Sequence, residues 1–91
     1  MILLKDGFYL EANGNASELY LMKLSVDGDE PVLVSVFSNL SDAINGAKNA
    51  LAIDRMMSGG DISLAEAEKL DTKAYYDIES LREDEKPFWK M

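Results

Sequence analysis

The chain has 91 residues, enough for one small domain but not for two domains that each close a hydrophobic core. Seventeen acidic and nine basic residues give a formal net charge of −8, which opposes direct binding to nucleic acid or to an anionic membrane. The sequence contains no His and no Cys, which excludes thiol nucleophiles, disulfides, and zinc or haem sites built on those side chains. We therefore predict no enzymatic activity, no metal and no cofactor.

The first part of the predicted single domain 1–91, residues 1–38, is rich in strand patterns. Residues 8–12 form an aromatic-rich run, and Asn13-Gly14 after it favours a tight turn because both residues tolerate a positive φ. Residues 19–26 alternate with period two, and residues 32–37 place three valines on one face of a β-branched run. These runs predict a three- to four-stranded antiparallel meander. One face of the 19–26 strand carries Tyr20, Met22, Leu24 and Val26, and the other carries Lys23 and Ser25.

The pattern of residues 39–58 predicts a helix that packs on this sheet. Asn39 is suited to the N-cap, and an apolar stripe at three- and four-residue spacing follows it, which predicts a helix over about 40–57. Gly46 costs this helix about 1 kcal/mol relative to Ala, which is expected where a strand passes close by. Of Met56 and Met57, we expect one in the core and the other exposed and adaptable. The predicted fold class is α+β.

The C-terminal part, residues 62–85, predicts one or two helices. Ser63 and Glu66 form a capping box at its start. At Asp71-Thr72 a further helix begins or the same helix continues, and both interpretations are open. The predicted narrow apolar stripe leaves the neighbouring Tyr76 exposed, because adjacent helical residues point in different directions. The stripe contains Ala74, Tyr75, Ile78 and Leu81, and residues 86–91 follow as an aromatic tail.

Acidic and aromatic side chains are the candidates for partner binding. The acids are spread along the chain, which is typical of a folded acidic face rather than an acidic tail. The acids of residues 27–30 lack the spacing of a calcium loop, so we assign them to a solvated turn. The aromatic pair in residues 86–91 packs either on the chain's own core or on a partner. The predicted contact residues are Asp27, Asp29, Glu30, Glu66, Glu68, Tyr76, Asp77, Glu79, Phe88 and Trp89.

The segment from Val32 to Leu51 resembles a pattern in small phage and prophage accessory proteins. Its β-branched strand runs into Phe37-Ser38-Asn39-Leu40-Ser41-Asp42-Ala43-Ile44, similar to the junction at which the last strand of their meander enters a helix. The small size, the acidic charge and the lack of cysteine are also similar to phage-encoded inhibitors of host defences, anti-CRISPR proteins among them. The resemblance implies a meander followed by a helix, and an inhibitor of a host protein.

Two functions from different classes are consistent with these features. The first is a non-enzymatic protein-binding module that inhibits or modulates a nucleic-acid-handling host protein by charge complementarity and steric occlusion. Its partner would be basic, and the affinity would fall with added salt. The alternative is a homo-oligomeric assembly protein that self-associates through the stripe of residues 64–81 and the C-terminal aromatics. No signal peptide or membrane span is recognisable, so we expect the cytoplasm of the host cell.

Overall fold

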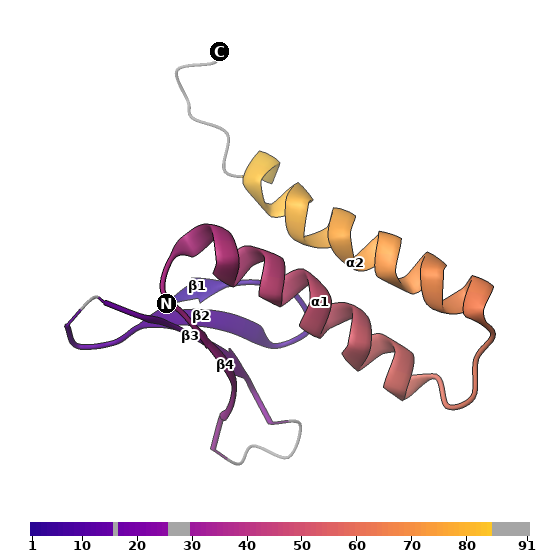
Figure 1. Ribbon diagram of the computed structural model, residues 1–91, viewed down its shortest axis with the longest axis horizontal. Helices are drawn as coiled ribbons and strands as arrows, with labels where there is room; N and C mark the ends of the chain where they lie inside the picture. Colours follow the sequence, from indigo (N-terminus) through magenta and orange to yellow (C-terminus); the bar gives the residue numbers. More distant parts are fainter. Residues whose placement is uncertain (16, 26–29, 85–91) are drawn as a thin grey trace.

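The computed structural model describes residues 1–15, 17–25 and 30–84. Within these residues, four antiparallel strands in the order β1-β2-β3-β4 are followed by two helices (Figure 1). The predicted α+β class, with an antiparallel meander and a helical C-terminal part, is confirmed. The elements are β1 (Ile2–Leu3), β2 (Phe8–Ala12), β3 (Leu19–Lys23), β4 (Val32–Phe37), α1 (Leu40–Ser58) and α2 (Leu64–Asp84).

A tight turn joins β1 to β2 at Asp6-Gly7. The φ angles of Asp6 and Gly7 are 54° and 85°, and the N–H of Phe8 donates to the carbonyl of Lys5 at 3.0 Å. Two successive left-handed residues are the geometry of a type I′ hairpin turn, which Asp-Gly favours. The turn places the two-residue strand β1 beside β2, and so adds a fourth strand to the three predicted runs.

The connection between β2 and β3 differs from the predicted tight turn. Neither Asn13 nor Gly14 has a positive φ. The Asn13 side chain instead supports a longer loop, because its Oδ1 accepts from the N–H of Ser17 at 2.9 Å and from that of Glu18 at 3.3 Å. An asparagine oxygen that binds nearby N–H groups stabilises a turn without left-handed main-chain geometry.

β4 pairs with β3 through an irregular register. Ser35 lies opposite Leu21 and Leu33 lies opposite Met22, so Val34 is an extra residue in β4 and forms a β-bulge. A bulge reverses the alternation of side chains on the two sides of it. Val32 and Val36 therefore lie on opposite faces of the sheet, and the prediction that the three valines share one face is wrong.

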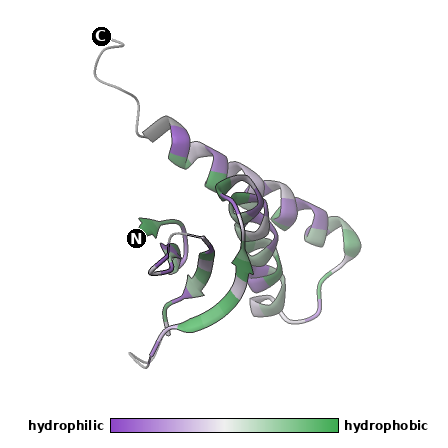
Figure 2. Ribbon diagram, turned by 60° about the vertical axis from the view of Figure 1, so that its left-hand side comes forward, coloured by the Kyte–Doolittle hydropathy of each residue, from purple (hydrophilic) through white to green (hydrophobic). Residues whose placement is uncertain are grey.

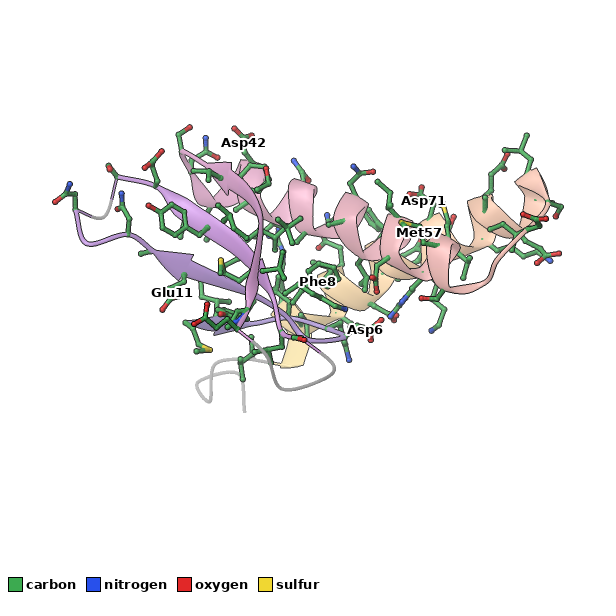
Figure 3. All side chains as sticks on the ribbon, turned by 90° about the horizontal axis from the view of Figure 1, so that it is seen from below. Asp6, Phe8, Glu11, Asp42, Met57 and Asp71 are labelled. Atoms are coloured by element: carbon green, nitrogen blue, oxygen red, sulfur yellow. The ribbon has the colours of Figure 1, made fainter. Side chains whose placement is uncertain are left out.

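The hydrophobic core lies between the sheet and the two helices. Leu10, Leu21 and Leu51 are its largest fully buried side chains, and Figure 3 shows Phe8 between the sheet and the helices. On β3 the helix-facing side carries Leu21, whereas the alternate set that includes Tyr20 lies on the other face. The alternation places Lys23 on the face opposite Tyr20, yet the helix packs on the face that carries Lys23, because Leu19 and Leu21 lie on that face as well.

Gly46 lets α1 approach β4 closely. A Cβ atom at Gly46 would lie 2.1 Å from Cζ of Phe37, far inside van der Waals contact. The phenyl ring therefore packs directly on the glycine. This contact confirms the prediction that a strand element passes close to α1 at this position.

α2 runs antiparallel to α1 as one continuous helix, which decides between the two interpretations at Asp71-Thr72 (Figure 1). Ser63 caps it, since its Oγ accepts from the N–H of Glu66 at 3.1 Å. Ala74 and Ile78 of the predicted stripe are buried in the core. Tyr75 is about half exposed and is not part of that buried stripe. The ammonium of Lys48 lies over its ring, 4.0 Å from the ring centroid.

Candidate functional site

Two of the predicted contact residues, Asp77 and Glu79, form ion pairs within the molecule. Nη1 of Arg55 lies 2.7 Å from Oδ2 of Asp77, and Nε of Arg55 lies 3.0 Å from Oδ2 of Asp6. Nζ of Lys48 pairs with Oε1 of Glu79. These contacts tie α1 to α2 and to the turn before β2. Both carboxylates therefore help to hold α1 and α2 together.

The ion pairs shift three pKa values. The hydrogen bond from Arg55 lowers the pKa of Asp77, and the hydrogen bond from Lys48 lowers the pKa of Glu79, in each case against the opposing effect of burial. Burial disfavours the charged Arg55, but its hydrogen bonds to Asp6 and Asp77 and their charges together outweigh burial and raise its pKa. A carboxyl group that serves as a general acid at neutral pH needs a raised pKa, and these two carboxyls have the opposite shift.

The structure does not gather the other described candidates into one acidic face. Glu68, Tyr76 and Asp77 line one shallow hollow on α2, but Lys69 and Lys73 line it too, so the charges there are mixed. Glu30 is exposed beside the start of β4, on a different element. The remaining candidates are Glu66, which is exposed on α2, and Asp27, Asp29, Phe88 and Trp89, which lie outside the described residues.

An apolar groove runs between β4 and α1, and we call it the β4–α1 groove. Its volume is about 610 Å³, within the usual range of 300–1,000 Å³ for ligand pockets. Val34 of β4 is 42% exposed on one side, and Ile53 and Met57 of α1 are 46% and 77% exposed on the other. Phe37 and Ala50, both packed against the core, also line it. The groove is therefore an uncovered apolar continuation of the core.

The same groove follows the border of the sheet. Among the described strands, β4 is last in the order and has β3 as its neighbour on one side. Figure 2 shows β4 as hydrophobic along most of its length, and no charged residue lies between Val32 and Phe37. Outward main-chain N–H and C=O groups of an edge strand are open to pairing with another chain. Exposed apolar side chains and an open main-chain edge thus meet in one place.

One ion pair lies at the groove lining. Nζ of Lys23 is 3.3 Å from Oδ2 of Asp54 and 4.4 Å from the ring centroid of Phe8. Both charged residues line the groove, so their formal charges cancel there. Glu30 is exposed near the Val32 end of β4 and adds negative charge beside the groove. The lining of the groove therefore carries no net formal charge, and the charge that Glu30 adds beside it is negative.

A second apolar hollow, of about 530 Å³, lies between β1, the start of α1 and the end of α2. Ile44, Ile78 and Leu81 in its lining are buried in the core or packed against it. No open strand edge comparable to that of β4 accompanies this hollow, because the edge strand there is the two-residue β1. The full lining is Met1, Ile2, Leu3, Leu4, Leu10, Leu40, Ile44, Ile78, Leu81 and Arg82.

Sequence reasoning missed most of the residues of the β4–α1 groove. The sequence patterns place Val34 in a strand and Ile53 in a helix, and neither pattern shows that the two elements leave a groove between them. The Met56-Met57 pair did carry a signal, since we expected one of them exposed, and Met57 is the exposed one. Exposed methionine is typical of adaptable binding surfaces.

Comparison of the chain with protein-family models, with curated proteins and with solved structures finds no match. Within residues 1–15, 17–25 and 30–84, no three or more acidic residues are grouped so that they could hold a metal ion. In the same part of the chain, neither helix has the length and apolar character needed to cross a membrane. The features of the chain that bear on its function are therefore the groove, the sheet edge and the net charge.

Proposed function

We propose that this chain acts by binding another protein, and that the β4–α1 groove is the main contact surface. The main support for this proposal is that Val34, Ile53 and Met57 form one exposed apolar surface beside an open strand edge. Contiguous apolar surface on a small domain, rimmed by polar groups, commonly marks a site of protein interaction. Burial of this surface by a partner would contribute to the free energy of binding, because the surface is in contact with water in the free chain.

The charge of the chain indicates the kind of partner. A net charge of −8 attracts a protein with a basic surface and speeds their encounter. Proteins that handle nucleic acids carry such surfaces, because they must neutralise phosphates with Lys and Arg. The proposed role is therefore to inhibit or modulate a nucleic-acid-handling protein of a host cell, in its cytoplasm, by charge complementarity and steric occlusion. The resemblance to phage-encoded inhibitors supports the same role.

The arrangement of the predicted stripe favours this function over self-association through residues 64–81. Ala74 and Ile78 are buried within the chain's own core, and Leu81 packs against it. A second copy would have to open the core to reach Ala74, and it would meet Leu81 only from the hollow beside β1. The β4–α1 groove needs no such rearrangement, because its walls are exposed already.

The test is capture of a binding protein from a bacterial lysate by the tagged chain and by two matched variants. Val34→Lys places a charge in the groove, and Leu64→Lys makes the same chemical change at a 77% exposed site at the start of α2. We expect a protein that binds the wild type and Leu64→Lys, is lost with Val34→Lys, and binds more weakly as salt is raised. Equal retention by all three proteins, or equal binding at low and high salt, would contradict the proposal.

A further inference from the structure

We infer that the partner binds as an extended segment that adds a strand antiparallel to β4, with every second side chain in the β4–α1 groove. This inference rests on the proposed function and specifies the partner's chemistry at the same surface. Strand addition takes affinity from main-chain hydrogen bonds and specificity from pockets for alternate side chains. The groove and the edge together provide both.

The edge of β4 has the properties that favour strand addition. Its six residues, Val32–Phe37, contain neither a charged residue nor a proline. Natural edge strands are usually protected by charge, proline, short length or a bulge. The bulge at Val34 affects one part of β4, while Ser35, Val36 and Phe37 keep a regular register with β3. This regular part offers its outer main-chain edge to an added strand.

The groove has room for the side chains of that strand. Successive residues of a strand point to opposite faces, so every second side chain of an added strand would point toward α1. There it would meet Ile53 and Met57, which line the groove from α1 and are exposed in the free chain. An unbranched methionine adapts to side chains of different shape. The segment should therefore have apolar residues at alternate positions.

Charge favours a basic segment over a second copy of this chain. Two copies joined edge to edge would each bring a net charge of −8. An added antiparallel strand ends beside the start of β4, where Glu30 is exposed. Lys or Arg directly after the apolar positions would lie near this carboxylate. The inferred occupant is thus an alternating apolar segment followed by basic residues.

A synthetic peptide tests the inference directly. The probe is a dye-labelled ten-residue peptide that alternates valine and threonine and ends in two lysines, and binding is measured by fluorescence anisotropy. Its control has the same sequence with N-methyl groups at alternate residues on the edge that pairs with β4, which block main-chain hydrogen bonds but keep the side chains. We expect the unmethylated peptide to bind at least about tenfold more tightly, because several main-chain hydrogen bonds are lost together.

Two protein variants locate the face of β4 that the peptide side chains contact. Val34→Lys lies in the groove, whereas Leu33→Lys lies on the same strand but on the other face, opposite Met22. We expect Val34→Lys to weaken peptide binding at least about tenfold and Leu33→Lys to leave it within about twofold. Circular dichroism confirms that both variants are folded before binding is compared.

The inference is overturned if the peptide does not bind, if the N-methylated peptide binds equally well, or if Val34→Lys has no effect. Failure of the inference is distinguishable from failure of the proposed function. A lysate protein lost with Val34→Lys while the peptide fails to bind would keep the function and reject strand addition. Peptide binding at β4 without any salt-sensitive lysate partner would keep strand addition and reject the proposed function.

Discussion

The core between the sheet and α1 and the β4–α1 groove are built from neighbouring parts of the same elements, and both are apolar. In the core, Leu21 and Leu51 are fully buried, whereas in the groove Val34 and Met57 are exposed. Apolar surface contributes to folding only to the extent that folding removes it from water. Core substitutions should therefore change stability, and groove substitutions should change binding while leaving stability nearly constant.

The largest expected effect is in the core. Leu51→Ala removes a fully buried side chain of α1 and leaves a cavity, so the free energy of unfolding should fall by about 2–5 kcal/mol. Urea denaturation followed by circular dichroism measures the loss. A loss below about 1 kcal/mol would mean that Leu51 is not part of a closely packed interior.

Gly46→Ala tests the contact that brings α1 close to β4. Alanine normally stabilises a helix interior by about 1 kcal/mol relative to glycine. Here the new methyl group would meet the ring of Phe37, and overpacking should outweigh that gain, so we expect a net loss of about 1 kcal/mol. In a Phe37→Ala background the same substitution should become stabilising. A gain in both backgrounds would show that the ring does not pack on Gly46.

Asp77→Asn tests the ion pair with Arg55. Because the pKa of Asp77 is lowered in the folded state, its ionised form stabilises the fold above the pKa of the unfolded chain. That contribution is lost as the pH falls through the folded-state pKa. We expect Asp77→Asn to cost about 1 kcal/mol at neutral pH, since water partly screens the pair, and to reduce the loss of stability on acidification.

The control for this prediction is Asp71→Asn, an exposed carboxylate on the same helix. Denaturation at pH 7 and pH 3 compares the wild type with both variants. Asp71→Asn should follow the wild type at both values of pH. Identical acid dependence in the wild type and Asp77→Asn would contradict a stabilising pair between Asp77 and Arg55.

The smallest expected effect on stability is in the groove. Met57→Ala should change the free energy of unfolding by less than about 0.5 kcal/mol, because its side chain is largely in water. The same variant should weaken binding of the alternating peptide, since Met57 forms a wall of the groove. A large loss of stability without an effect on binding would assign Met57 to the core instead.

Much of the fold could be predicted from local patterns. The N-cap Asn39 accepts from the N–H of Asp42 at 2.8 Å, and the helix begins one residue after it, as the period change indicated. Asp6-Gly7 is also a favoured hairpin-turn pair, but β1 before it is only two residues long and has no period-two pattern from which a strand could be predicted. The bulge at Val34 had no local signal, since all residues around it are strand formers.

The candidate site was less accessible to sequence reasoning. Asp77 appeared as a surface acid because its partner Arg55 lies on another helix, and a distant ion pair has no sequence spacing. The groove depends on β4 being the edge strand, which follows from the strand order and not from the composition of β4. A strand with the same valines in the centre of a sheet would have no free edge.

Hydrogen exchange of the β4 amides, measured residue by residue by NMR with and without the alternating peptide, tests the central claim most directly. Outward amides of β4, in the segment Ser35–Phe37 above all, should exchange markedly more slowly in the complex, because they gain main-chain partners. The amides of β1, at the opposite edge, should be unchanged. A complex that forms without any slowing of exchange in β4 would contradict strand addition at this edge.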